Sequence, residues 1–300
     1  MKPTVFIQTN HKQIVGALVA QHSLRRNSQH ADLFDVRIMH TSEFPFLTAR
    51  EGQKYLRDGV TRVWHMEDLQ SFTPTRFLPP QLMGYEGRAV VIDPDVFAVA
   101  DVWELLSRDM EGAAIMCRPR SGYKEKKGVM ATSVMLLDCA KLTHWKVEEQ
   151  FSELFAMKLD YAKWIGLLYE PRESIRLMEN EWNDLDKLTP ATKMVHMTKR
   201  KTQPWKTGLP VDFMLPEKPS GFVALGWLNL LRRRVFGDYA FLGHYIPHPD
   251  PNQERFFFGL LRECLDNGLV TMDMLREEMR QNHVRHDALQ VLERTVPLAA

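Results

Sequence analysis

Short apolar runs alternate with segments of helical periodicity along the first half of the chain. Residues 5–9 predict a strand, and the apolar positions of residues 14–24 recur at the spacing of a helix. Further strands are predicted at residues 34–39, 60–64, 89–92, 113–117 and 134–137, and helices at 55–56, 75–83, 102–106 and 142–157. Residues 89–92 are all apolar, which is typical of a strand covered on both faces. This alternation predicts an α/β fold with a mostly parallel sheet flanked by helices.

The pattern changes beyond residue 159. Residues 194–197 predict another strand, and several prolines and glycines between residues 204 and 219 mark a passage rich in loops. Helical patterning returns at residues 256–265, 272–279 and 289–292. We therefore predict a sheet-bearing domain of residues 1–215 and a helical C-terminal extension of residues 216–300.

Charge and cysteine content limit the partners and the cellular compartment that the protein can have. Thirty-nine basic and thirty-eight acidic residues nearly cancel, which argues against nucleic acid as a partner. Cys117, Cys139 and Cys264 are odd in number and lie in apolar surroundings, which is typical of buried thiols in a reducing cytoplasm. The N-terminus lacks the apolar region of a signal peptide. We predict a soluble, cytoplasmic protein.

The apolar run at residues 222–231 is the longest late in the chain, and it ends in three arginines at 232–234. It is shorter than the roughly 20 apolar residues that a transmembrane helix needs. A helix there could rest on an anionic membrane surface, although a helix packed on the core is the more common arrangement. The sequence leaves both this peripheral membrane contact and self-association into an oligomer open.

Two carboxylates follow the apolar run 89–92, in the segment Asp93-Pro94-Asp95. Ligands of α/β sheets bind at the carboxyl ends of strands. Alternate residues of an extended chain face the same side, so Asp93 and Asp95 can converge on one hard cation while Pro94 stiffens the turn. Mn²⁺ or Mg²⁺ would bridge such a pair to the phosphates of a substrate. The alternative is that these acids only cap the next segment.

The same region resembles the family 8 glycosyltransferases, retaining enzymes of the GT-A fold that use nucleotide sugars and a divalent metal. Residues 75–83, 88–95 and 101–106 together look like the central signature of that family. In the signature an arginine precedes a proline-containing helix, and Arg76 occupies its position. The resemblance implies that Arg76 contacts the donor, since a guanidinium can grip hydroxyls or phosphates through several bonds. A surface arginine beside a helix is the alternative.

Residues 7–10 and 22–24 are similar to the first strand and helix of these enzymes. In the family, the loop after the first strand receives the nucleotide base and ribose. The resemblance implies this role for Thr9, Asn10 and His11, although a turn with a helix N-cap explains Thr9 and Asn10 nearly as well.

Residues 194–198, which lead to Gln203-Pro204-Trp205, resemble a late block of the family, and so do residues 182–183 upstream. The histidine of that late block completes the metal site, and His196 is its counterpart here. An imidazole nitrogen beside two carboxylates favours Mn²⁺ over Mg²⁺.

Three parts of the chain depart from the family pattern. The late block is one residue longer and lacks the family's glycine and lysine, so we assign neutralisation of the diphosphate to Lys201, although a solvated basic loop at residues 199–201 explains this lysine equally well. Thr132 and Ser133 replace the small residues and asparagine that contact the donor sugar, and their hydroxyls could still bond it. Asp160 lies where the family has an aspartate near the reacting carbon, although an aspartate that begins a helix is the more common role.

The resemblance implies a Mn²⁺-dependent retaining glycosyltransferase that moves a sugar from a nucleoside diphosphate sugar, taken to be a UDP-sugar, to an acceptor that the sequence does not identify. A protein that binds a nucleotide sugar without catalysis is one alternative, because several motifs are altered. A phosphohydrolase that uses the first Asp of Asp-x-Asp as nucleophile is another, but such enzymes usually carry the motif on their first strand.

Overall fold

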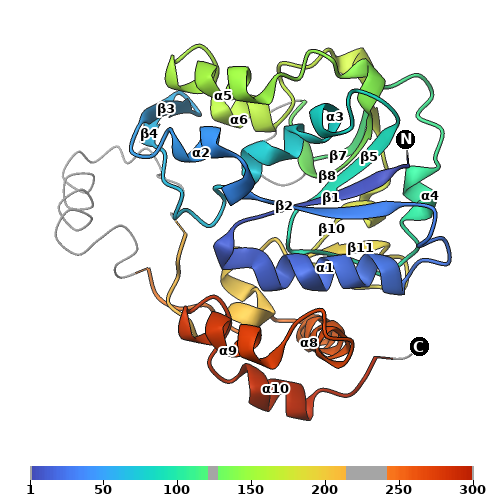
Figure 1. Cartoon of the computed structure of the whole chain (residues 1–300), viewed down its shortest axis with the longest axis vertical. Helices are drawn as coiled ribbons and strands as arrows, with labels where there is room; N and C mark the ends of the chain where they lie inside the picture. Colours follow the sequence, from blue (N-terminus) through green and yellow to red (C-terminus); the bar gives the residue numbers. More distant parts are fainter. Residues whose placement is uncertain (1, 121–127, 214–241, 299–300) are drawn as a thin grey trace.

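The computed structural model describes residues 2–120, 128–213 and 242–298 (Figure 1). Its central sheet has six strands in the order β2-β1-β5-β8-β7-β9. Only β8 runs against the others, because β5 and β7 both pair with it in antiparallel fashion while the other pairings are parallel. Five of these six strands therefore share one direction, which confirms the predicted mostly parallel α/β sheet. The bounds are β1 (Thr4–Thr9), β2 (Asp35–His40), β5 (Arg88–Ile92), β7 (Ile115–Pro119), β8 (Met130–Asp138) and β9 (Ile175–Leu177).

Strand β5 lies between two hydrophobic cores, as its apolar run predicts. Val90 and Ile92 face the core that includes α1 (Ile14–Arg26), whereas Ala89 and Val91 face the core that includes α5 (Val147–Phe155). All four side chains are fully buried. Successive residues of a strand point to opposite faces, so burial on both faces requires an unbroken apolar sequence.

Helix α1 packs closely against the turn that follows β5. A Cβ atom on Gly16 would lie 2.6 Å from the carbonyl oxygen of Pro94, well inside van der Waals contact. A residue without a side chain is therefore required at this point of the helix. The contact fixes the position of the turn between Asp93 and Asp95.

A second, three-stranded sheet continues the chain beyond that turn. It has the order β10-β11-β6, formed by β6 (Val96–Ala98), β10 (Asp184–Leu185) and β11 (Met194–His196). Strands β6 and β11 are antiparallel, with His196 opposite Val96. This pairing brings a segment from late in the chain beside the acidic turn.

Several predicted elements differ from those observed. The helix predicted at residues 55–56 is wrong, because these residues belong to β3 (Lys54–Arg57), which forms a hairpin with β4 (Val60–Val63). Asp58 and Gly59 both have positive φ in the two-residue turn, which is the backbone conformation of a type I′ hairpin. The helix predicted at residues 75–83 is a 3₁₀ turn (Thr73–Phe77) followed by the short α3 (Pro79–Leu82), because prolines at 79 and 80 cannot donate to a preceding turn.

Five further helices agree with the predicted ones in type, although their bounds shift; they are α4 (Trp103–Leu106), α5, α8 (Pro251–Asp266), α9 (Met272–Arg280) and α10 (Ala288–Arg294). The short helices α2 (Pro45–Thr48) and α6 (Tyr161–Ile165) were not predicted. Helix α5 is shorter than the predicted 142–157.

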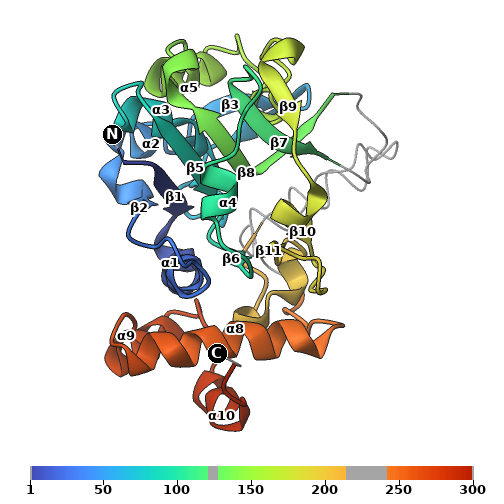
Figure 2. The ribbon, with the colours of Figure 1, turned by 90° about the vertical axis from the view of Figure 1, so that its right-hand side faces the viewer.

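Helices α8, α9 and α10 lie beyond α1, on the side away from the central sheet (Figures 1 and 2). Phe257 and Leu260 of α8 are fully buried in the core that α1 shares. Across the same contact, the Glu263 carboxylate pairs with His22 at 2.7 Å and with Arg26 at 2.8 Å. The predicted boundary at 215/216 and the run 222–234 lie outside the described residues, so the division into two domains and the membrane contact stay predictions.

No helix in the described part of the chain combines the length and the apolar character needed to cross a membrane. The three cysteines are buried, as their apolar surroundings predict.

Candidate metal centre

The acidic pair lies at the carboxyl end of β5, where the chain leaves the central sheet. The amide of Asp93 still donates to the Ser133 carbonyl at 3.0 Å, which extends the pairing with β8 by one residue. The chain then turns, and the amide of Val96 donates back to the Asp93 carbonyl at 3.2 Å. Both carboxylates are largely buried, with 13% of the Asp93 side chain and 14% of the Asp95 side chain exposed.

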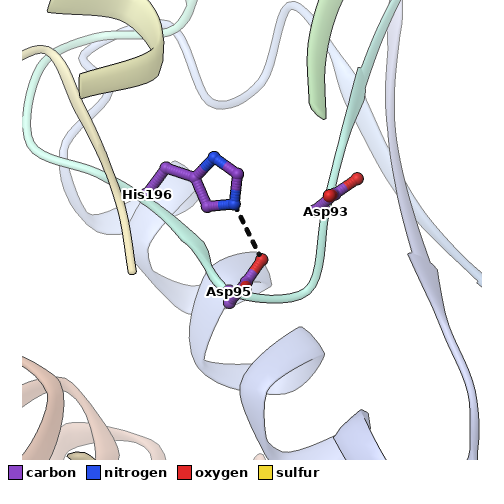
Figure 3. Close-up of side chains that lie close together, drawn as sticks. All are labelled: Asp93, Asp95 and His196. Atoms are coloured by element: carbon purple, nitrogen blue, oxygen red, sulfur yellow. Dashed lines mark ion pairs between the residues drawn. The ribbon is translucent and has the colours of Figure 1, made fainter. Parts of the chain in front are cut away.

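His196 reaches the acidic pair through the pairing of β11 with β6. The amide of Met197 donates to the Asp95 carbonyl at 3.0 Å and fixes the two segments side by side. The imidazole points at the acids, and its Nε2 lies 3.4 Å from Oδ1 of Asp95 (Figure 3). One ligand atom from each of Asp93, Asp95 and His196 lies within 4.8 Å of the others. The structure therefore brings the three predicted metal ligands together.

Asp93 is held by two residues from other elements. The Arg76 guanidinium bonds its carboxylate at 3.0 and 3.3 Å, and the Gln8 amide donates to the same Oδ1. Arg76 also donates to the hydroxyl of Thr132, which in turn donates to the Ile165 carbonyl at 2.7 Å. The predicted residues Arg76 and Thr132 thus lie beside the metal centre, and they orient one of its carboxylates.

Asp95 and His196 are each held by a neutral amide. The Gln203 amide nitrogen donates to Oδ2 of Asp95 at 2.9 Å, and Oδ1 of Asn183 lies 2.9 Å from Nδ1 of His196. Asn183 is anchored in turn by Ser133, whose hydroxyl accepts from its side-chain nitrogen at 2.9 Å. Each of the three ligand side chains therefore has an amide partner, and these partners come from separate parts of the chain.

The charges of the site favour a bound cation. Burial raises the pKa of Asp93, and the neighbouring Asp95 adds to this effect against the opposing charge of Arg76. Burial alone would lower the pKa of His196, but Asp95 and then Asp93 outweigh it, so the His196 pKa is raised. Two buried carboxylates repel each other, and positive charge between them relieves this repulsion.

The donor set suits a divalent transition metal. Two carboxylate oxygens and one imidazole nitrogen are ligands that Mn²⁺ accepts, and the nitrogen makes the set less suited to Mg²⁺. Three protein ligands would leave the remaining coordination positions of such an ion to water or to other oxygen ligands.

Two predicted residues bond to other parts of the fold. Asp160 caps the N-terminus of α6, accepting from the amides of Ala162 and Lys163, and it also accepts from the amides of Asp58 and Gly59 in the hairpin turn. Burial opposes ionisation, but these four N–H groups outweigh it and lower the pKa of Asp160. The Lys201 ammonium donates to the Leu242 carbonyl at 3.1 Å. A catalytic role for either residue stays a prediction.

The predicted nucleotide-binding residues lie at the end of β1 and contact the loop around residues 67–71. The side-chain oxygen of Asn10 accepts from the amide of Lys12 and so caps a 3₁₀ turn. The side-chain nitrogen of Asn10 donates to the Asp68 and Leu69 carbonyls and to the Ser71 hydroxyl. The Thr9 hydroxyl donates to the Asn10 carbonyl at 3.2 Å. The His11 ring lies 3.3 Å from the carboxylate of Glu67, and burial lowers the pKa of His11. Contact with a nucleotide stays a prediction for these three residues.

Three residues of the site, Gln8, Asn183 and Gln203, received no role from the sequence. All three side chains are essentially inaccessible to solvent, with exposed fractions of 0%, 0% and 1%. Gln8 lies in a strand whose residues are all buried, directly after three apolar residues, and a buried amide at such a position is a signal that it has a specific partner. Asn183 and Gln203 lie in the two late blocks, residues 182–183 and 203–205, that carry the family resemblance, but their polar character gave no signal because polar residues are expected in irregular segments.

Comparisons with known proteins add distant similarities. No protein-family model and no curated protein matches the chain. Among solved structures, the apo form of glycosyltransferase GlyE from Streptococcus pneumoniae TIGR4 is similar, with 13% identity, a TM-score of 0.48 and coverage of 90% of this chain. This chain spans 64% of the length of that protein. The bifunctional glycosyltransferase WbbM is similar as well, with 14% identity, a TM-score of 0.46 and coverage of 68% of this chain. This chain spans 47% of the length of WbbM.

Galactosyltransferase LgtC, solved with donor and acceptor sugar analogs, is also similar, with 10% identity, a TM-score of 0.47 and coverage of 68% of this chain and 89% of that chain. At these identities and TM-scores, the function of this chain rests on its own residues.

Proposed function

We propose that this chain is a metal-dependent glycosyltransferase that moves a sugar from a nucleoside diphosphate to an acceptor hydroxyl. The observation that carries the proposal is the convergence of Asp93, Asp95 and His196 at the carboxyl end of a buried central strand. This is the position where α/β sheets bind ligands, and an acidic cation site there matches a diphosphate substrate.

Within this proposal, a bound cation supplies positive charge that stabilises the diphosphate as it leaves. Arg76 and Gln8 keep Asp93 aimed at the site, and Gln203 does the same for Asp95. We further propose Mn²⁺ as the cation, a UDP-sugar as the donor and retention of the anomeric configuration, with the acceptor attacking from the side that the diphosphate leaves.

Lys201 is proposed to neutralise the leaving diphosphate, and Asp160 to stabilise positive charge on the sugar. Thr9, Asn10 and His11 are proposed to receive the nucleotide, and Thr132 and Ser133 the sugar. The three buried thiols suit a reducing cytoplasm, which is the proposed location.

A second candidate is a protein that binds a nucleotide sugar without turnover. The observations in its favour are the bonds of Asp160 to four backbone amides and of Lys201 to a carbonyl, since both groups would have to exchange partners to act on a substrate.

One assay separates these functions. Purified protein is mixed with Mn²⁺ and a panel of nucleotide sugars, and free nucleoside diphosphate is measured with and without a chelator. Chelator-sensitive release from one donor supports the transferase, donor binding without release supports the second candidate, and phosphate release from monoesters supports a phosphohydrolase. Failure to bind any donor contradicts the proposal.

The matched variants are Asp95→Asn and Asp35→Asn. Asp95→Asn should abolish metal-dependent donor binding and leave the fold intact. Asp35 pairs with Lys2 on the exposed surface, so Asp35→Asn should bind as the unaltered protein does. Unchanged donor binding by Asp95→Asn would remove Asp95 from the site.

A further inference from the structure

A buried chain of hydrogen bonds runs from His196 away from the acids. Nδ1 of His196 lies 2.9 Å from Oδ1 of Asn183, and the side-chain nitrogen of Asn183 donates to the Ser133 hydroxyl at 2.9 Å. The exposed fractions of these residues are 5% for His196, 0% for Asn183 and 8% for Ser133. Water therefore has little access to compete for these bonds.

Asn183 is fixed by more than its side chain. Its carbonyl accepts from the guanidinium of Arg118 at 2.7 Å, inside the protein. Its neighbour Trp182 is fully buried in the core that includes α1. The amide thus meets the imidazole from a rigid position.

The orientation of this amide decides which imidazole nitrogen can bind a cation. A carbonyl oxygen can only accept, so Oδ1 of Asn183 requires a hydrogen on Nδ1 of His196. A neutral imidazole carries one hydrogen, and with that hydrogen on Nδ1 the lone pair is on Nε2. Nε2 is the nitrogen that faces Asp95.

We propose that Asn183, anchored by Ser133, is the positioning residue that keeps the hydrogen of His196 on Nδ1 and thereby presents Nε2 to a divalent cation. This inference rests on the proposed metal centre. It also gives Ser133 a part in the metal centre, beside the contact with the donor sugar proposed above. Partners of this kind typically change metal affinity by about 10- to 100-fold when they are removed.

The test compares two substitutions in the full chain by calorimetric titration with Mn²⁺ alone. Asn183→Leu removes the acceptor and should weaken Mn²⁺ binding by about 10- to 100-fold. Asn183→Asp keeps an acceptor for the Nδ1 hydrogen, so its Mn²⁺ affinity should stay within a few-fold of the unaltered protein. A residue with only a structural role would not show this rescue.

Asn27→Leu is the matched control. Asn27 donates to the Ser23 and Ala98 carbonyls at the end of α1, so its loss should lower the thermal midpoint without changing Mn²⁺ affinity. Ser133→Ala removes the anchor and should weaken Mn²⁺ binding several-fold, which keeps the test decisive if Asn183→Leu does not fold.

Equal Mn²⁺ affinity in Asn183→Leu and the unaltered protein overturns the inference while the metal centre stands. Equal weakening by Asn183→Leu and Asn183→Asp overturns it as well, and so does unchanged affinity in Ser133→Ala if Asn183→Leu is unfolded. Absence of Mn²⁺ binding by the unaltered protein instead contradicts the metal centre, and with it this inference.

Discussion

The protonation of His196 and Asp93 opposes the binding of a cation at low pH. The Asp95 and Asp93 carboxylates raise the pKa of His196, and burial raises the pKa of Asp93. A metal ion needs a neutral imidazole and an ionised carboxylate, so protons must leave before it binds.

Affinity for Mn²⁺ should therefore increase as the pH rises from 6 to 8. The contribution of His196 to the stability of the metal-free protein changes with pH in the opposite direction. Because the folded-state pKa of His196 is raised, its ion pair stabilises the protein below the unfolded pKa of about 6.5, and this contribution is lost as the pH rises through the folded pKa. Titration with Mn²⁺ at several pH values checks the predicted increase in affinity. An Mn²⁺ affinity that is constant or falls as the pH rises would contradict it.

At the scale of single residues, the sequence predicted the ligands better than their partners. The neighbours of Asp93 and Asp95 in sequence, an apolar run and a proline, indicate a strand end and a turn. The partners Asn183 and Gln203 come from irregular segments, and pairing within the β10-β11-β6 sheet brings Asn183 to the site beside His196. A pattern in one segment carries no information about which distant side chain will meet it.

At the scale of elements, the contact of α1 with the acidic turn should reverse the usual effect of a glycine-to-alanine substitution on stability. Glycine to alanine within a helix normally stabilises by about 1 kcal/mol. At Gly16 the added methyl would meet the Pro94 carbonyl at 2.6 Å. We expect Gly16→Ala to lower the free energy of unfolding by about 1–3 kcal/mol and to weaken Mn²⁺ binding, because the turn must move.

Chemical denaturation and Mn²⁺ titration measure both effects. Gln21→Ala on the same helix is the control and should change neither by much. A gain in stability for Gly16→Ala would show that α1 does not press on the turn.

Asp160 joins the hairpin of β3 and β4 to the start of α6, beside the edge-on contact of Tyr55 with Tyr161. Asp160 bonds two amides in the hairpin turn and two at the start of the helix. Asp160→Ala should cost about 1–2 kcal/mol of stability at pH 7, as the loss of a helix cap does. Because the Asp160 pKa is lowered, the carboxylate stabilises the fold above the unfolded pKa of about 3.9, and this contribution is lost as the pH falls through the folded pKa.

Thermal unfolding of the unaltered protein, Asp160→Ala and Asp160→Asn at pH 7 and at about pH 2.5 tests this role. Asparagine also caps helices, so Asp160→Asn should lose less stability than Asp160→Ala. If Asp160→Asn instead keeps full stability and loses all transferase activity, the catalytic role predicted from sequence is supported.

The type of an element, helix or strand, could be predicted from the sequence where its pattern of apolar residues extended over enough residues. Strand β5, with its four apolar residues 89–92, and the helices α1 and α8 are examples. Strands β6, β10 and β11 have only two or three residues each, and such lengths carry no period. The strand predicted at residues 194–197 corresponds to β11, but β6 and β10 were not predicted, and the sheet that the three strands form depends on pairing that no local pattern shows.

At the scale of the whole molecule, the late helices share the core that lies beneath the candidate site. Phe257 of α8 stacks on Trp205 with ring centroids 4.6 Å apart, and Phe97 of β6 meets Trp205 edge-on at 5.9 Å. All three side chains are buried. The segment that carries Gln203 is therefore held in place by α8.

Phe257→Ala should lower the free energy of unfolding by about 3–5 kcal/mol, because a fully buried aromatic ring is removed from this core. Urea unfolding followed by tryptophan fluorescence measures the change. Arg255→Ala, at an exposed position on the same helix, should have little effect. A loss below about 1 kcal/mol for Phe257→Ala would mean that the packing of α8 contributes little to stability.

The central claim is that Asp93, Asp95 and His196 hold one divalent cation. Its most direct test is calorimetric titration of Mn²⁺ into the chelator-treated protein, repeated with Asp95→Asn and His196→Gln. We predict one bound Mn²⁺ per chain in the unaltered protein and loss of that binding in both variants, with their far-ultraviolet circular dichroism unchanged. Folded variants that bind Mn²⁺ as tightly as the unaltered protein would contradict the claim.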